Sequence, residues 1–253
     1  MTDETRPEPT VEEIVAEVER RTVRPEPARE LSPAERRLVI TANRAIFWLL
    51  RHWLAFFNLG AFLYVGLPFL APLLMRAGME GMAQIVYALY RPLCHQLPYR
   101  SWYLFGSQLT YTVEELARLV GPEALVQHGY IGDVTLGFKV ALCQRDTAIY
   151  GSILLAGLAY GGVRRRVRPL PLWVYLLFGV LPIGLDGGLQ VLSYALPLLI
   201  PSLAISPLES TPLRRVVTGV LFGLMTVWLA YPNFEEAASD VLAMLERRFG
   251  WER

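Results

Sequence analysis

Residues 53–75 read WLAFFNLGAFLYVGLPFLAPLLM, a run of 23 positions without a charged side chain. A helix rises about 1.5 Å per residue and the hydrocarbon core of a bilayer is about 30 Å thick, so about 20 apolar residues can cross it. The run is long enough, and it ends at Arg76. This segment therefore predicts a membrane-spanning helix.

Three further apolar segments follow, at residues 140–163, 172–196 and 216–232. The composition of the whole chain agrees with a membrane protein, because 53% of its 253 residues are hydrophobic and only 19% are charged. A typical soluble domain carries about 25% charged residues. The sequence predicts an all-α, polytopic membrane protein with four transmembrane helices, short interfacial helices and a membrane domain over residues 38–232.

The distribution of arginine predicts the orientation. Basic clusters precede the first span and separate the second from the third: Arg36, Arg37, Arg44 and Arg51, then Arg164, Arg165, Arg166 and Arg168. The positive-inside rule places both clusters in the cytoplasm. Four spans across the plasma membrane then put both termini in the cytoplasm. Residues 76–139 and 197–215 then lie outside. Arg214 and Arg215 lie in the second outer region and count against this orientation.

Each end of the chain carries a short amphipathic pattern. Residues 1–37 are acidic and contain prolines, which predicts a cytoplasmic, partly disordered tail with one short helix that begins at a capping box of residues 10–13. Residues 233–253 predict a cytoplasmic amphipathic helix with a box at residues 233–236. Either helix suits an interface with lipid or a contact with a protein partner.

Charge and cysteine content exclude several classes of protein. The 24 basic and 23 acidic residues nearly cancel, so no global field attracts nucleic acid. Two cysteines exclude a disulfide-dense scaffold and a four-cysteine metal site. The sequence also lacks the motifs of serine hydrolases, zinc proteases and P-loop proteins. The partner that the composition indicates is the lipid bilayer.

Four polar clusters interrupt this apolar chain. They are CHQLPYRS at residues 94–101, CQRDT at 143–147, DGGLQ at 186–190 and ESTPLRR at 209–215. The predicted topology places all four at the outer level of the membrane. A charge buried in a span normally pairs inside the helix bundle. We therefore expect Asp186 to pair with Arg145, Arg214 or Arg215.

Cys94 and Cys143 allow three interpretations. In an oxidising exterior they can form a disulfide that ties the outer loop to the second span. Alternatively, Cys94, His95, Cys143 and Asp146 supply a mixed set of S, N and O ligands for zinc or another first-row divalent metal. Adjacent Cys and His side chains do not easily bind one ion together. In the third interpretation both cysteines are plain thiols.

The charged residues near these ligands are candidates for catalysis, anion binding or support of a metal: Arg145, Asp186, Glu209 and Arg214. They fit an outward-facing polar site in a metal-binding membrane enzyme or a small transporter. The inner halves of the spans look apolar, which favours a one-sided site over a transport path. The alternative is a structural or assembly subunit, in which an Asp186–arginine pair locks helix packing and Glu209 caps a helix.

The order of these motifs is similar to that of a known family. The motifs are Cys94-His95-Gln96-x-Pro98-x-Arg100-Ser101, Leu142-Cys143-x-Arg145-x-Thr147, Leu185-Asp186-Gly187 and Glu209-Ser210-Thr211. Over residues 90–225 they resemble the predicted membrane proteins catalogued as domain of unknown function 2085. The resemblance implies a multi-span membrane fold and no established activity. Where members typically have Cys-x-Arg-Cys, this chain has Asp146 in place of the second thiol.

The same comparison of motifs indicates an insertion. The connection between the first and second motifs is longer than is usual in the family, so residues 111–138 resemble an inserted helical hairpin. Thr112 and Glu115 form a capping box at its start.

Overall fold

The structure is a computed structural model of the chain, and it describes residues 10–13, 17, 32–126, 128–200, 202 and 208–251. Two units are distinguished, residues 1–48 and 49–253. In the first unit, the capping box predicted at residues 10–13 is present. Most of the predicted helix that follows lies outside the described residues. Helix α2 (Pro33–Arg51) begins in the first unit, after a further capping box of Ser32 and Glu35.

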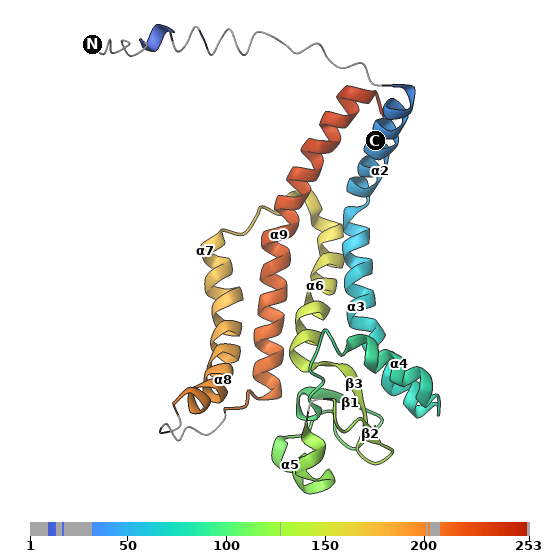
Figure 1. Cartoon of the computed structure of the whole chain (residues 1–253), viewed down its shortest axis with the longest axis vertical. Coiled ribbons are helices and arrows are strands. Elements are labelled where there is room, and N and C mark those ends of the chain that lie inside the picture. The colour runs from blue at the N-terminus through green and yellow to red at the C-terminus, as the bar shows by residue number, and fades with distance from the viewer. Residues whose placement is uncertain are drawn as a thin grey trace, which may run out of the picture. The chain divides into compact units, whose positions relative to one another are not determined.

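Four long helices form most of the second unit (Figure 1). They are α3 (Trp53–Arg76), α6 (Gln144–Val163), a helix over residues 172–199 and α9 (Pro212–Phe249). The third consists of α7 (Leu172–Val174), a π-helical segment (Tyr175–Val180) and α8 (Leu181–Leu199). Among the described residues, α3, α7–α8 and α9 are long and apolar enough to cross a membrane. The helical membrane fold is thus confirmed, whereas the count of four spans stays a prediction.

The second predicted span begins later than expected. Residues 137–143 form strand β3 (Gly137–Cys143), and α6 starts at Gln144. Phe138 to Leu142 are buried on both faces of the strand, so that, apart from Lys139, their sequence is an apolar run without alternation. Such a run fits a buried strand as well as a buried helix, so the pattern alone did not separate the two.

A small antiparallel sheet lies at the end of α6 where that helix begins (Figure 1). Its order is β1 (Ser101–Leu104), β3 and β2 (Gly132–Asp133). Ser101 pairs with Cys143 across β1 and β3. The pairing brings the end of the first polar motif beside the start of the second, although more than 40 residues separate them in the chain.

The predicted helical hairpin over residues 111–138 is wrong. The capping box of Thr112 and Glu115 is present and begins α5 (Val113–Val120). Gly121, with φ +88°, and Pro122 then end that helix, and a short 3-10 helix (Pro122–Leu125) and strand β2 follow. The second half of the insertion contains glycines that suit turns and close strand pairing, not a second helix.

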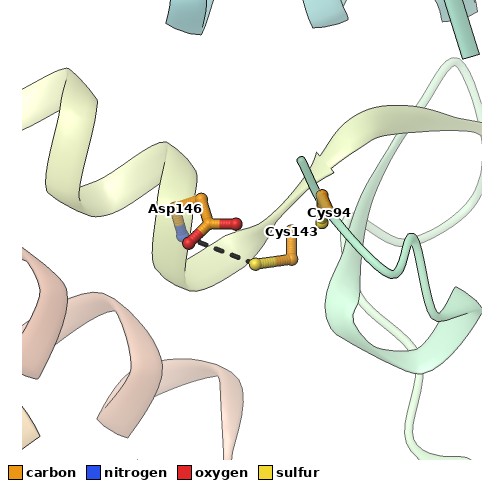
Figure 2. Close-up of side chains that lie close together, drawn as sticks. All are labelled: Cys94, Cys143 and Asp146. Atoms are coloured by element: carbon orange, nitrogen blue, oxygen red, sulfur yellow. Dashed lines mark hydrogen bonds between the residues drawn. The ribbon is translucent and has the colours of Figure 1, made fainter. Parts of the chain in front are cut away.

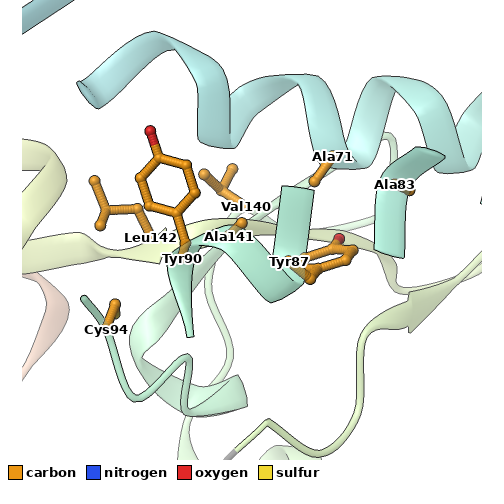
Figure 3. Packing of buried hydrophobic residues seen from close by; sticks show 8 residues of the cluster. All are labelled: Ala71, Ala83, Tyr87, Tyr90, Cys94, Val140, Ala141 and Leu142. Carbon is orange, nitrogen blue, oxygen red and sulfur yellow. The ribbon is translucent and has the colours of Figure 1, made fainter. Parts of the chain in front are cut away.

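Two apolar clusters join the sheet region to its neighbours. One contains residues from α3, β3 and α4 (Glu80–Tyr90), with the Cys94 side chain at its edge (Figure 3). The other packs Tyr103 and Tyr111 against Leu116 and Leu136. In α3, Pro68 frees the carbonyl of Tyr64, which accepts a hydrogen bond from the Tyr90 hydroxyl at 2.9 Å. This contact fixes α4 against α3 and hence the loop that carries Cys94.

Helix α9 continues through residue 249, so the separate amphipathic helix predicted to begin at Asn233 is wrong. The Asn233 amide donates to the Leu229 carbonyl within the helix instead of capping a new one. Pro232 removes the hydrogen bond to the Trp228 carbonyl, but that carbonyl accepts from the Leu170 backbone N–H instead. The helix therefore passes the proline without a break.

Helix α6 lies between α3 and α9 (Figure 1). Two glycines four residues apart on α9 allow the close approach of α6. A Cβ atom at Gly219 would lie 2.9 Å from the Arg145 carbonyl oxygen, and one at Gly223 would lie 2.5 Å from that of Ile149. Small residues at this spacing let helix backbones approach each other closely in membranes.

Candidate functional site

A polar pocket of about 200 Å³ forms where the loop after α4 meets the beginning of α6 and the helices α8 and α9. Its lining contains thiol, carboxylate, imidazole, amide and guanidinium groups. The polar side chains are Cys94, His95, Gln96, Arg100, Cys143, Arg145, Asp146, Gln190 and Arg215. All four polar motifs of the sequence contribute to the pocket or to the residues directly behind it.

The thiols of Cys94 and Cys143 and a carboxylate oxygen of Asp146 all lie within 4.8 Å of one another. Figure 2 shows Cys94 on the loop, Cys143 at the junction of β3 and α6, and Asp146 in the first turn of α6. Cys143 is the N-cap of α6, and its sulfur accepts a hydrogen bond from the Asp146 backbone N–H at 3.5 Å. The strand-to-helix junction thus positions two of the three groups.

Both cysteines are free thiols in the structure, so the disulfide interpretation is not supported. A hydrogen bond from the Cys143 thiol lowers the pKa of Cys94, burial opposes this effect, and the Gln96 backbone N–H lowers the pKa further. The net effect is a pKa below the ordinary value for Cys94. A thiol that loses its proton more readily is a better metal ligand, because the thiolate is the form that binds.

His95 does not join the other three predicted ligands. It lines the pocket but is exposed, and the cluster found among the described residues contains only Cys94, Cys143 and Asp146. Gln96 has a positive φ of 49°, so the backbone turns sharply directly after His95. Of the four predicted ligands, three therefore lie together and His95 lies apart from them.

Asp186 pairs with Arg145, one of the three arginines predicted for it, with 2.5 Å between the nitrogen and the oxygen. The Ser210 hydroxyl donates to the same carboxylate at 2.7 Å. Gly187 leaves room for this pair, because a Cβ atom there would lie 2.9 Å from a guanidinium nitrogen of Arg145. Gly187 is thus a packing position that admits the arginine.

Glu209 is bound by more side chains than a helix cap requires. Its carboxylate accepts hydrogen bonds from Arg100 at 2.7 Å, Gln190 at 2.6 Å, Tyr194 at 2.5 Å and Arg215 at 3.0 Å. These four residues belong to the loop before β1, to α8 and to α9. Glu209 therefore ties three elements together behind the pocket.

The cap of α9 is Thr211, whose hydroxyl accepts from the Arg214 backbone N–H at 3.3 Å. The interpretation of Glu209 as that cap is wrong, because the residue that directly precedes the helix performs this role.

Arg215, not the predicted Arg214, faces the site. Arg214 is exposed, whereas Arg215 is 3% exposed and donates to the Gln144 side chain at 3.1 Å. The signal in the sequence was the spacing to Gly219 and Gly223, because residues four apart lie on one face of a helix. That face of α9 packs against α6.

Lys139 also lies at the site, although none of the four polar motifs contains it. It is fully buried in β3, and its ammonium group donates to the Gln96 carbonyl at 2.9 Å. Burial lowers its pKa to about 8, an effect that the nearby Cys94 partly offsets and that Arg91 adds to. The ammonium group of Lys139 contacts the loop that carries Cys94, so its positive charge stabilises the negative charge that the site gains when its thiols ionise.

Lys139 predicts a pH dependence of stability. Its pKa is about 8 in the folded chain against 10.5 as the reference value, so between these values the unfolded chain binds more protons and stability rises with pH. At pH 8 the folded chain has lost only half of this proton, so the full slope of about 1.36 kcal/mol per unit is reached only above the folded pKa. From pH 8 to 9.5 we therefore expect a gain of about 1.5 kcal/mol. Thermal unfolding in detergent measures it. The same rise in Lys139→Met would contradict this assignment, because that variant has no proton to lose.

Comparisons with known proteins agree with the resemblance of the motifs. A family model described as predicted membrane protein (DUF2085) matches residues 134–229. The uncharacterized protein MJ1492 of Methanocaldococcus jannaschii is 24% identical over 152 residues, which are 60% of this chain and 69% of that protein. No solved structure matches. Residues 134–229, which carry Cys143, Asp146, Asp186 and Glu209, are thus similar to the predicted membrane proteins of DUF2085, as the motifs indicated.

Proposed function

We propose that this chain binds a divalent transition metal, with zinc as the best match, through Cys94, Cys143 and Asp146. The observation that carries the proposal is the clustering of these three ligand atoms within 4.8 Å of one another beside an open pocket. Sulfur and carboxylate ligands together suit zinc, whereas magnesium and calcium prefer oxygen alone.

The cluster needs only a small contraction to bind an ion. Zinc–sulfur bonds are about 2.3 Å long, and at the tetrahedral angle they place two sulfurs about 3.8 Å apart. The three ligand atoms already lie within 4.8 Å of one another. Three protein ligands leave one position of a tetrahedral ion for water or substrate, which is the arrangement of catalytic rather than structural zinc sites.

The walls of the pocket favour an anionic substrate. Three arginines line the pocket, Arg100, Arg145 and Arg215, and one terminal nitrogen of each donates to Glu209 or Asp186. A guanidinium group has five N–H donors, so a carboxylate or phosphate oxygen in the pocket can accept from those that face it. A metal in such a site supplies Lewis-acid polarisation of a substrate oxygen or activation of bound water. We therefore favour an enzyme over a transporter.

The proposal places this site at the outer face of the plasma membrane, with α6 as the fourth span and both termini in the cytoplasm. A helix of 20 residues is about 30 Å long, which matches the hydrocarbon core. Because α6 packs between α3 and α9, Ser152 and Gly157 of this helix are buried against neighbouring helices. The arginines at residues 164–168 then fall on the cytoplasmic side.

Metal content per chain tests the proposal. The protein is purified in mild detergent without chelator, and zinc is measured for the wild type, Cys94→Ala and His95→Ala. We expect close to one zinc per wild-type chain, loss of zinc in Cys94→Ala, and retention in His95→Ala, which changes an exposed neighbour in the same pocket. Cobalt substitution adds a thiolate-to-metal absorption band that the Cys94 variant lacks.

Two results would overturn the metal site. One is a wild-type protein that takes up no zinc even after incubation with excess metal. The other is equal zinc in the wild type and the Cys94→Ala variant. Size-exclusion chromatography of each variant shows whether loss of metal reflects loss of folding.

A structural subunit is the second candidate, and the dense pairing around Asp186 and Glu209 favours it. Exchange of the charges of Arg145 and Asp186 separates the two candidates. If the two residues form only a packing pair, the exchanged pair still forms, and the protein keeps its fold and its assembly with partners. A pocket that binds an anion through Arg145 does not tolerate it.

A further inference from the structure

A second hollow, with a volume of about 610 Å³, lies along α6 and is separate from the polar pocket. Its walls come from α3, β1, the segment after β1, α6 and α9. The lining is almost entirely apolar and includes Phe69, Trp102, Leu155, Val220 and Leu224. It shares no residue with the polar pocket.

The two hydroxyl side chains in this hollow are already used by the helix that carries them. Thr147 donates to the Cys143 carbonyl at 2.9 Å, and Ser152 donates to the Ile149 carbonyl at 2.9 Å. Ordered water needs two to four polar partners, so this lining does not suit water. An apolar occupant fits it.

The position of the hollow indicates which apolar occupant can reach it. It extends from Thr147 to Leu155 on α6, about 12 Å along the helix axis, beside residues 216–224 of α9. Helices α3 and α9 are long and apolar enough to cross a membrane. At the end nearest the sheet stands Trp102, a residue type that is enriched at the level of lipid headgroups.

We propose that this hollow binds one acyl chain of a membrane phospholipid. An acyl chain is elongated and apolar, the hollow is apolar and extends about 12 Å along α6, and in a bilayer an acyl chain is the apolar group present at this depth. The exposed faces of α3 and α8 also contact lipid, but there the lipids exchange freely. The hollow instead presents apolar side chains from α3, β1, α6 and α9 to one chain, and the inference is independent of the metal site.

Gly151 offers a direct way to fill the hollow. It lines the cavity, and a Cβ atom there would have nothing within 4 Å. Gly151→Phe therefore places a ring in the space of the acyl chain without a clash at Cβ. Gly162, on the same helix but outside the hollow, also has open space around it. Gly162→Phe is the matched control.

The experiment reconstitutes the protein in nanodiscs of phosphatidylethanolamine and phosphatidylglycerol that contain a phospholipid with a photoreactive diazirine near the end of one acyl chain. After illumination, labelled peptides are identified by mass spectrometry. We expect labels concentrated on residues 147–155 and 216–224. This labelling should be lost in Gly151→Phe and retained in Gly162→Phe.

Three outcomes would overturn the proposal. Labelling of the hollow no stronger than that of exposed α3 positions such as Phe62 would show ordinary lipid contact. Unchanged labelling in Gly151→Phe would place the lipid elsewhere. A dimer in light-scattering measurements, with crosslinks between copies through residues 147–155, would show that a second chain covers the hollow. Circular dichroism confirms that both variants keep their helices.

Discussion

Gly223→Val is expected to disrupt the packing of α6 against α9 and to lower the stability of the folded protein strongly. A Cβ atom at Gly223 would lie 2.1 Å from the Ser152 hydroxyl oxygen and 2.5 Å from the Ile149 carbonyl oxygen. The serine side chain can rotate, but the carbonyl belongs to the backbone of α6 and cannot move alone. Inserting atoms into a packed contact costs about 1–3 kcal/mol, and more where backbone must shift.

A matched control for this variant is Gly60→Val. Gly60 lies within a long apolar helix, α3, and a Cβ atom there has nothing within 4 Å. Both variants add the same β-branched side chain, so a difference between them reports contact rather than helix propensity. Thermal unfolding in detergent is the measurement. Equal stability of the two variants would show that α6 and α9 do not approach as closely as the structure describes.

The contact between α6 and α9 also positions residues of the candidate metal site. The first turn of α6 carries Arg145 and Asp146, and Gly219 packs directly on the Arg145 carbonyl. Separation of the two helices would therefore displace a predicted ligand and the partner of Asp186. Gly223→Val should consequently lose zinc together with stability, whereas Cys94→Ala should lose zinc and keep most of its stability.

The long helices were predictable because their signal is local. Residues 53–75 and 172–196 are apolar over a length that matches a bilayer, and the structure has helices there. Strand β3 was not predictable in the same way, because burial on both faces removes the alternation of apolar and polar residues that identifies a strand. The boundary at Gln144 depends on tertiary contacts with α3 and α4.

Some residues of the site could be predicted from the chemistry of their side chains and others from their spacing along a helix. A charge in an apolar helix needs a partner, which predicted that Asp186 would pair with an arginine. The selection of Arg215 over Arg214 needed the face of α9, which the glycines at positions 219 and 223 indicate. One reason against His95 as a ligand was present in the sequence, because adjacent Cys and His side chains do not easily bind one ion together. The structure adds the backbone turn at Gln96, and the His95 side chain lies apart from the other three groups.

Glu209→Ala is expected to cost about 3–5 kcal/mol of stability, the range for removal of one partner from a buried ion pair. The variant leaves Arg215, which is 3% exposed, without its carboxylate, and it also unpairs Arg100. Part of this loss is offset because the side chain of Glu209 is 22% exposed and water can enter. Thermal unfolding measures the change, and Glu236→Ala, an exposed acid on α9, is the control.

A second substitution separates charge from hydrogen bonding at this position. Glu209→Gln keeps one carbonyl oxygen that can accept from Arg100 or Arg215, but it leaves their charges uncompensated. If charge compensation dominates, Glu209→Gln should lose nearly as much stability as Glu209→Ala. If the tie between the loop, α8 and α9 dominates, the glutamine variant should recover part of it, because its one oxygen can still accept from either Gln190 or Tyr194, which donate to different oxygens of the carboxylate.

The glutamine variant also bears on the pocket. Loss of the carboxylate leaves Arg100 and Arg215 with more positive charge toward the pocket that they line. A site for an anion should then bind phosphate more tightly in Glu209→Gln than in the wild type, even though the protein is less stable. Weaker or unchanged phosphate binding would mean that these arginines serve packing. A variant that is less stable and yet binds phosphate more tightly is expected only where the same guanidinium groups contact both Glu209 and a ligand.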